Sequence, residues 1–241
     1  MKILSVSTAT NHLSVAINEG SKVLVEANEE DQRNHSEHLD PLIDQLLKQT
    51  QLKLADIDRF AVAIGPGSYT GLRIGITTIK MFASILNKEC AGVSTLAALA
   101  ANVAAKDKLV VSLIDARNDN FFAGAYLNGE NVIADGHYAF DRLLAAIKQV
   151  EADRKLPLVF VGSGLDKIKD RLDQSKLDYE FGQADQNQPH AGEIGRLAEH
   201  IEPVDPDQLL PRYLRRTQAE VDWHKKTGQP YGPDSAYVEE V

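Results

Sequence analysis

A glycine-rich segment is the first place where residue types and spacing suggest chemistry. Residues 64–75 contain four glycines and lie between a strand-like run and a helix-like run. Free backbone N–H groups at a helix start after a glycine loop attract phosphate, so an anion site is one interpretation. The other is a tight turn, since Gly65 and Gly67 tolerate positive φ. Ser68 or Thr70 can cap the helix, and the lack of a Walker loop or dinucleotide fingerprint favours the turn.

Histidine, acidic and cysteine side chains provide few other candidates. His35 and His38 lie three apart at a predicted helix start, a spacing that sometimes holds a metal, but surface structure is the favoured interpretation. Asp115 and Arg117 follow a predicted strand, and a structural ion pair is favoured over a partner contact. The single cysteine, Cys90, permits no disulfide and no multi-cysteine metal site. The sequence therefore predicts no metal site.

The composition is that of a folded chain with an acidic balance. The 241 residues are 43% hydrophobic and 25% charged, which argues against a mainly disordered chain. The net charge of −9 repels phosphate backbones, so tight RNA binding by this chain alone is not expected. The first residues do not resemble a signal peptide, and no apolar run approaches spanning length. Together with the one cysteine, this predicts a cytoplasmic protein without membrane contact.

Alternating and helical patterns divide the first half of the chain into a regular set of elements. An antiparallel meander of strands comes first, followed by an amphipathic helix that begins at Ser36 or at Asp40. A buried strand, the helix after the glycine segment, another strand and an alanine-rich helix capped by Ser94 complete the set. The predicted strands are 3–6, 13–18, 22–28, 60–64 and 89–93, and the predicted helices are 36–50, 70–86 and 94–104.

The same order of elements begins again after residue 108. A unit that occurs twice indicates two similar lobes rather than a solenoid, which has shorter and more numerous repeats. We expect an N-terminal lobe over residues 1–106, a C-terminal lobe over 107–202 and an irregular extension with one helical stretch over 203–241. In the second half, strands are predicted at 109–114, 121–127, 132–137, 158–161 and 179–181, and helices at 140–150, from 165 and at 191–200.

Two lobes of this order resemble the actin, hexokinase and Hsp70 ATPase superfamily. The resemblance implies an α/β fold of duplicated actin-like (ASKHA, ribonuclease H-like) lobes, in which helices flank mixed sheets. Members that use ATP carry an aspartate at the end of the first strand of each lobe, and these places hold Ser7 and Asp115 here. Gly162 and Gly164 form a second glycine turn similar to the adenosine loop, which implies weak nucleotide contact. Hydrolysis is not expected, and an ATP-dependent kinase of this superfamily is the alternative function.

The predicted helix after the glycine segment carries glycines in its interior. Gly71 and Gly75 lie one turn apart, and each costs about 1 kcal/mol relative to alanine. Leu72, Ile76 and Ile79 form one apolar seam. Further apolar side chains extend beyond this seam, so the helix is predicted to be buried on two sides, and the pattern alone favours the lobe's own core over another chain. The apolar residues off the seam are Ile74, Met81 and Ile85.

Residues 65–75 resemble the signature of the TsaB (YeaZ) family. The resemblance covers nearly the whole chain and is weak only after Arg216. It implies a role in threonylcarbamoylation (t6A) of the adenosine adjacent to the anticodon in tRNAs that read codons starting with A. The other features of the family are the opening residues 3–8, the helix entry at 35–39, and residues 93–97, 115–117 and 211–215.

The family resemblance implies a subunit without catalytic residues. The catalytic relative, TsaD, carries a His-x-x-x-His metal pair after the strand that follows its glycine helix, and residues 94–98 hold no such ligand here. No metal or cofactor is therefore implied, which weighs against a metallopeptidase. In the family, TsaD transfers the threonylcarbamoyl group, TsaE joins the complex, and tRNA is reached indirectly.

The resemblance also implies a docking surface. The helices at 36–50 and 70–87 pack against the equivalent pair of TsaD, or against a second copy of the chain in a homodimer. The implied partner-binding residues are Leu39, Leu42, Leu46, Gly67, Ser68, Tyr69, Thr70, Gly71, Leu72, Arg73, Gly75, Ile76, Thr78 and Ile79.

Overall fold

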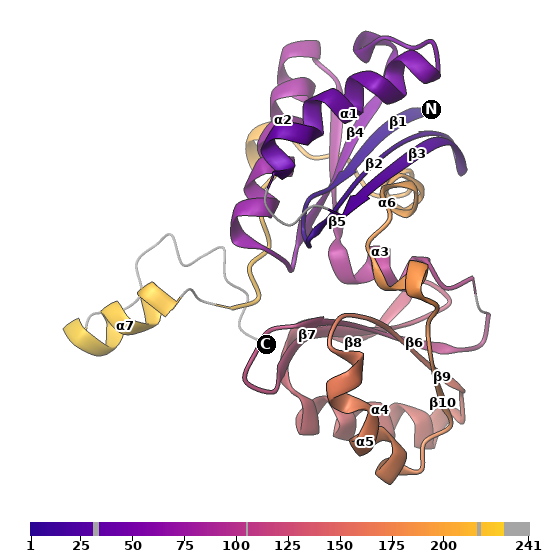
Figure 1. The fold of residues 1–241 in the computed structure, drawn as a ribbon, viewed down its shortest axis with the longest axis vertical. Coiled ribbons are helices and arrows are strands. Elements are labelled where there is room, and N and C mark those ends of the chain that lie inside the picture. The colour runs from indigo at the N-terminus through magenta and orange to yellow at the C-terminus, as the bar shows by residue number, and fades with distance from the viewer. Residues whose placement is uncertain (31–33, 105, 216–217, 229–241) are drawn as a thin grey trace.

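The computed structural model contains two five-stranded mixed sheets, one above the other in Figure 1. It describes residues 1–30, 34–104, 106–215 and 218–228. The first sheet has the order β3-β2-β1-β4-β5, in which β1 is antiparallel to β2 and parallel to β4. Its strands are β1 (Lys2–Ser7), β2 (His12–Glu19), β3 (Lys22–Glu30), β4 (Arg59–Gly65) and β5 (Glu89–Ser94).

The second sheet repeats this pattern in the order β10-β9-β6-β7-β8. Here β6 is antiparallel to β7 and parallel to β9, as β1 is to β2 and β4. The two sheets confirm the predicted fold class of duplicated α/β lobes with mixed sheets. The strands are β6 (Leu109–Asp115), β7 (Asn120–Leu127), β8 (Glu130–Ala139), β9 (Leu158–Gly162) and β10 (Tyr179–Phe181).

Helices α1 (His35–Gln49) and α2 (Tyr69–Leu86) pack against the same face of the first sheet (Figure 1). Helix α1 starts at His35 with Asn34 before it, so neither predicted start, Ser36 or Asp40, is right. Helix α2 is capped by Ser68, whose Oγ accepts the N–H of Gly71 at 3.2 Å. A short turn, η1 (Leu54–Asp56), leads from α1 towards β4.

Two helices pack against the sheet of the other half of the chain. Helix α3 (Thr95–Ala101), shorter than predicted and capped by Ser94, follows the first sheet but packs against β6 and β7. Helix α6 (Ala191–Ala198) follows the second sheet but packs on β1 and β2, where Ser5 Oγ donates to Ala191 O at 2.6 Å. Each sheet is thus covered in part by a helix from the other predicted lobe, and the boundaries at residues 106 and 202 remain predictions.

Helices α4 (Phe140–Arg154) and α5 (Leu165–Ser175) cover the second sheet. The core beneath them is aromatic: Phe121 and Phe140 meet at a ring-centroid distance of 5.8 Å, and both are fully buried. Ile168 and Leu172 of α5 face this core, while the rest of that helix is mostly polar. The second lobe therefore closes its core with one amphipathic face from each helix.

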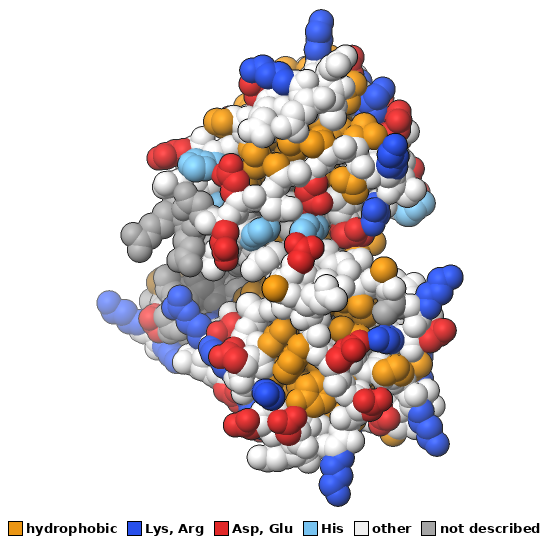
Figure 2. Space-filling model, turned by 45° about the vertical axis from the view of Figure 1, so that its right-hand side comes forward, with side chains coloured by type: hydrophobic (Ala, Val, Ile, Leu, Met, Phe, Trp, Pro, Cys, Tyr) orange, Lys and Arg blue, Asp and Glu red, His pale blue; other side chains and the backbone are white. Residues whose placement is uncertain are grey.

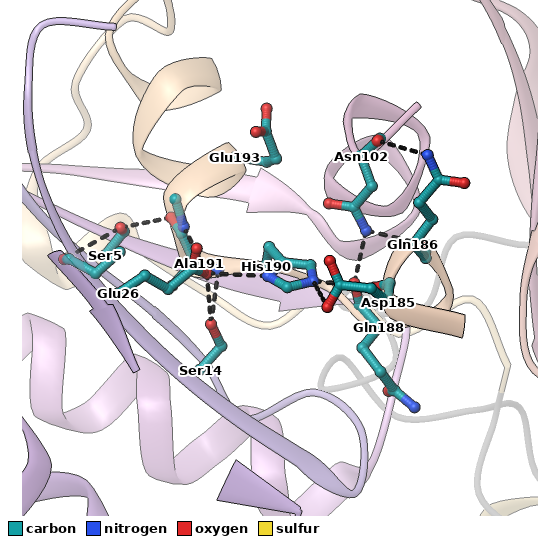
Figure 3. Close-up of polar contacts among 12 residues, drawn as sticks. Ser5, Ser14, Glu26, Asn102, Asp185, Gln186, Gln188, His190, Ala191 and Glu193 are labelled. Atoms are coloured by element: carbon teal, nitrogen blue, oxygen red, sulfur yellow. Dashed lines mark hydrogen bonds and ion pairs between the residues drawn. The ribbon is translucent and has the colours of Figure 1, made fainter. Parts of the chain in front are cut away.

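The connection between the lobes has a polar part beside the apolar cluster that α3 forms with β6, β7 and β9. On the face drawn in Figure 2, acidic and histidine side chains gather near the level where the lobes meet. In Figure 3 the His190 ring lies between Glu26 and Asp185, with Nδ1 3.2 Å from Glu26 Oε1 and Nε2 3.0 Å from Asp185 O. The hydrogen bond with Glu26 raises the pKa of His190 to about 9. Asp185 belongs to the turn η2 (Ala184–Asn187), which follows β10 of the second sheet.

The C-terminal residues return across the first lobe and reach the second. The backbone N–H of Val204 donates to Cys90 O at 2.9 Å, and the turn η3 (Pro206–Gln208) lies against α2. Cys90 is fully buried. Helix α7 (Gln218–Thr227) confirms the predicted helical stretch and projects away from the lobes (Figure 1). Of the predicted extension, residues 216–217 and 229–241 lie outside the described residues.

Among the described helices, none combines the length and the apolar character needed to cross a membrane.

Candidate functional site

The glycines of α2 face the lobe's own interior. A Cβ at Gly71 would lie 2.0 Å from the carbonyl oxygen of Thr8, and one at Gly75 would lie 2.4 Å from Thr8 Oγ1. In the turn before the helix, a Cβ at Gly67 would meet the carbonyl oxygen of Ala9 at 2.2 Å. Thr8 Oγ1 also donates to Gly71 O at 2.7 Å. The glycine groove is therefore filled by the residues that follow β1, which is the own-core packing that the pattern favoured.

The leucine and isoleucine residues predicted for docking also lie in the core of the first lobe. They belong to one cluster with β1, β2 and β4, and none exposes more than 4% of its surface. A partner therefore cannot reach their side chains while the lobe is folded, and what they do in the structure is fix the two helices on the sheet. These residues are Leu39, Leu42 and Leu46 of α1, and Leu72, Ile76 and Ile79 of α2.

The outer face of α2 is different, because an exposed stripe runs along it at four-residue spacing. Tyr69, Met81 and Ile85 in this stripe are 49%, 44% and 74% exposed. Arg73 and Thr77 lie between them in the same i, i+4 row, which winds across the outer surface of the helix, and they are also exposed. We call these five residues the α2 outer stripe. Exposed aromatic, methionine and arginine side chains together are typical of protein interfaces.

A groove separates α1 from α2 beside this stripe. Its volume is about 430 Å³, and its α1 wall consists of Ser36, Leu39 and Asp40. The buried Leu39 contributes little surface there, so Ser36 and Asp40 present polar groups to the opening. The α2 wall contains Tyr69, Thr70, Arg73, Ile74, Thr77 and Thr78. The structure thus brings Tyr69, Thr70, Arg73 and Thr78 of the predicted docking set into one surface, whereas Gly67 and the exposed Ser68 line a different cavity.

An aromatic and cationic cluster closes one end of the groove. The rings of Tyr69 and Tyr213 stack with centroids 5.1 Å apart and planes at 19°. The guanidinium of Arg73 lies 4.6 Å from the Tyr69 ring centroid, and its Nε donates to Tyr213 Oη at 3.0 Å. That hydrogen bond raises the pKa of Arg73, which remains charged. Tyr213 was not predicted as a site residue, although the run 211–215 that contains it is one of the family features.

A second cavity, of about 930 Å³, lies between the lobes and contains both glycine turns. In it, Asp115 is paired with Lys167. Burial raises the pKa of this carboxyl, but the hydrogen bonds from Lys167 and from the backbone N–H of Arg117, together with the positive charges of both side chains, lower it by more, so the pKa is lowered overall. The prediction of an ion pair between Asp115 and Arg117 is wrong, because the partner of Asp115 is Lys167. The contact from Arg117 is its backbone N–H, which donates to Asp115 Oδ1 at 3.0 Å.

The glycine turn of the second lobe has its donors engaged within the chain. Gly162 N donates to Asn187 Oδ1 at 2.9 Å, and Ser163 N donates to Leu113 O at 2.9 Å. A Cβ at Gly162 would lie 1.9 Å from the same Leu113 oxygen. Gly162 and Gly164 both line the cavity and both have positive φ, so glycine at these places is explained by the turn itself. Their predicted nucleotide contact stays a prediction.

The histidine pair at the start of α1 is engaged in structural contacts. His35 Nε2 lies 2.8 Å from the carbonyl oxygen of Thr10, and His38 Nδ1 lies 2.8 Å from Glu29 Oε2. Within the part of the chain that the structure describes, no group of three or more His, Cys, Asp or Glu side chains is arranged to hold a metal ion.

Two mixed sheets of this order, with a cavity between them, define a two-lobed protein of the actin-like class. A family model described as "TsaD: tRNA N6-adenosine threonylcarbamoyltransferase" matches residues 24–223. The Bacillus subtilis protein named "tRNA threonylcarbamoyladenosine biosynthesis protein TsaB" is 33% identical over 228 residues, which are 92% of this chain and 98% of that protein. The chain belongs to the TsaB (YeaZ) family, within the wider family that the TsaD model describes.

Further relatives agree with this placement. The Escherichia coli protein of the same name is 36% identical over 140 residues, 56% of this chain and 59% of that protein. Among solved structures, YeaZ from Pseudomonas aeruginosa superposes with a TM-score of 0.70 and 25% identity, covering 88% of this chain and 99% of that one. A second Pseudomonas aeruginosa structure, titled as similar to peptidase YEAZ, has a TM-score of 0.73 and 27% identity over 89% of this chain and 99% of that one.

Proposed function

We propose that this chain is a non-catalytic subunit of the cytoplasmic machinery that places threonylcarbamoyl on the tRNA adenosine beside the anticodon. It binds and activates TsaD through the outer faces of α1 and α2, and it meets TsaE and tRNA within the larger complex. The observation that carries the proposal is the α2 outer stripe, since three large apolar side chains are exposed on a helix whose inner face is fully packed.

The energetics favour a protein partner for this surface. Burying apolar surface contributes about 25 cal/mol per Å², and tyrosine and arginine are the side chains that most often dominate interface energies. The stripe offers Tyr69 and Arg73 at one end and Met81 and Ile85 at the other. A partner helix that crosses α2 along this i, i+4 row would cover all four, and the same surface would serve a homodimer when TsaD is absent.

The positions where related enzymes hold reactive groups support a role without catalysis. Ser7 at the end of β1 is fully buried. Ser94, in the region where a TsaD-like histidine pair would begin, caps α3 and donates to Asp135 Oδ2 at 2.5 Å. Asp115 is held by Lys167. We therefore expect no magnesium-dependent ATP turnover by the isolated chain, and such turnover would favour the kinase alternative. Weak nucleotide contact at Gly162 and Gly164 remains part of the proposal.

The proposal is tested by measuring the affinity for TsaD of a variant that carries a charge in the α2 outer stripe. Ile85→Glu should weaken the complex at least about tenfold, as for a central interface residue, and should lower t6A formation in a reconstituted assay. Its thermal unfolding should be unchanged, because Ile85 is 74% exposed. Leu24→Glu, at an exposed leucine of β3, is the matched control and should bind normally. Full-strength binding by Ile85→Glu would show that the surface is assigned to the wrong face.

A further inference from the structure

The last described residues before α7 form a connection between the second lobe and the candidate docking surface. Residues 202–215 pass along the edge of the first sheet, where Leu209 is 3% exposed and belongs to the core of that lobe. Arg212 N donates to Ile64 O at 2.7 Å, next to the glycine turn that precedes α2. We call residues 202–215 the return segment. Its backbone is therefore fixed on the first lobe immediately before Tyr213.

Tyr213 contacts the α2 wall of the groove from outside the groove. It does not line the groove, but it contacts two residues that do, stacking on Tyr69 and accepting a hydrogen bond from Arg73. Long side chains such as these lose rotamer freedom when a partner immobilises them, which weakens binding. Because Tyr213 already holds both side chains, part of that ordering is complete before a partner arrives.

Arg212, the neighbour of Tyr213, is anchored in the second lobe. Its Nη1 lies 3.2 Å from Oδ2 of Asp135, a residue of β8 that is only 5% exposed. The same carboxylate accepts hydrogen bonds from Ser94 Oγ at 2.5 Å, from Asn131 Nδ2 at 3.1 Å and from the Tyr126 hydroxyl. A buried carboxylate is costly unless it is paired and hydrogen-bonded, so this arrangement holds Arg212 firmly.

We propose that the second lobe preorganises the docking surface through the return segment, with Asp135 fixing Arg212 and Arg212 placing Tyr213 against Tyr69 and Arg73. This inference rests on the proposed function, since it concerns the same docking surface. Through this preorganisation the second lobe contributes to partner binding, although helices α4 and α5 of that lobe are not part of the docking surface. Arg212, Asp135 and Tyr213 act as positioning residues for Tyr69 and Arg73.

A double-mutant cycle on the full-length chain tests the proposal. Arg212→Gln and Tyr213→Ala should each weaken TsaD binding about fivefold to tenfold, and the double variant should be no weaker than the worse single variant, because both changes release the same pair of side chains. Arg212→Lys should restore part of the affinity. Arg154→Gln, an exposed arginine of α4, is the control and should bind normally. Thermal unfolding of each variant establishes that it is folded.

The outcomes separate this inference from the proposed function. Wild-type affinity in a folded Arg212→Gln variant overturns the inference, and so do losses that add in the double variant. If Arg212→Gln does not fold, Tyr213→Ala and Tyr213→Phe decide, since the second keeps the stacked ring and loses only the hydroxyl that accepts from Arg73. Tyr213→Ala should bind more weakly than Tyr213→Phe, and equal wild-type affinity in both overturns the inference. Failure of the docking surface itself would appear as normal binding by Ile85→Glu.

Discussion

Helices α2 and α5 occupy corresponding places in the two lobes, and their outer faces differ. Each follows a glycine turn at the end of a strand that pairs in parallel with the first strand of its lobe. Helix α2 has 18 residues and exposes the outer stripe, whereas α5 has 11 residues and exposes Lys169, Asp170 and Asp173. Charged side chains are well solvated, whereas exposed apolar side chains favour burial against a partner, so of these two helices we propose α2 as the docking helix.

The two glycine turns, in contrast, are alike in their cause. A Cβ at Gly67 would meet the carbonyl oxygen of Ala9, and one at Gly162 would meet that of Leu113. In both lobes the turn passes so close to the preceding backbone that no side chain fits. The glycines are thus explained by internal packing in both lobes, and the functional difference that we propose rests on the exposed residues beyond them.

The largest effect is expected where the inner face of α2 meets β1. Leucine at Gly75 would overlap Thr8 Oγ1 and press on Val62 Cγ2, which lies 3.2 Å from the position of a Cβ. Gly75→Leu should reduce the free energy of unfolding by about 3 kcal/mol or more, through overpacking. Urea denaturation measures this change. Thr77→Leu, at an exposed position of the same helix, should leave it nearly unchanged, and a similar loss in both variants would contradict the contrast between the two faces.

The free energy of unfolding should fall at alkaline pH, because His190 lies in the polar contact between the lobes. The folded-state pKa of His190 is raised to about 9 from 6.5, chiefly by Glu26, so its stabilising contribution is complete below pH 6.5 and is lost as the pH rises through 9. The wild type should lose about 2 kcal/mol across this range. His190→Gln should lose much less. The other ionisable groups near His190, namely His12, Asp185 and Glu193, are unchanged in the variant. Parallel pH profiles of the two proteins would show that His190 is not the responsible group.

A smaller effect is expected on self-association, which we place on the α2 face. Met81→Glu should weaken any homodimer about tenfold, which corresponds to about 1.4 kcal/mol. Lys169→Glu on the outer face of α5 should leave the dimerisation constant unchanged. Sedimentation velocity over a concentration series measures both. A dimer weakened by Lys169→Glu and not by Met81→Glu would assign the contact to the second lobe.

The smallest effect is expected at the glycine turn of the second lobe. Asp115→Asn removes a partly exposed ion pair with Lys167, so the melting temperature at pH 7 should shift by less than about 2 °C. The lowered pKa of Asp115 means that its contribution exists above its unfolded pKa and is lost as the pH falls. Differential scanning fluorimetry at pH 7 and pH 4 tests this. A large decrease in melting temperature at pH 7 would show that the second-lobe glycine turn contributes as much to stability as the turn before α2.

Local patterns in the sequence were sufficient to predict most of the fold. Period-two and helical spacing located the ten strands of the described residues and the main helices, because the apolar spacing of each element shows which of its faces is buried. The repeated order then indicated two lobes. The start of α1 was missed, since Asn34 provides no side-chain cap and Ser36 looked like one.

Contacts between distant residues could not be predicted in the same way. The cost of Gly71 and Gly75 was visible in the sequence, but nothing local shows that Thr8 fills the groove beside them. The hydrogen bond between Arg73 and Tyr213 joins residues 140 positions apart. Within the predicted docking set, Leu72 and its neighbours lie in the core, whereas Tyr69 and Arg73 are exposed. When a helix is apolar on two sides, periodicity alone does not show which side faces solvent.

The crossing of α6 onto the first sheet has a consequence for the order of events during synthesis. Ser5 reaches its hydrogen-bond partner Ala191 across 186 positions, and Ile194 and Ala198 fill the core beside β1. The amino-terminal lobe emerges from the ribosome first but lacks one of its covering helices until almost the whole described chain has been made. Since contacts of such long range form slowly, the half that is translated first is the half that is completed last.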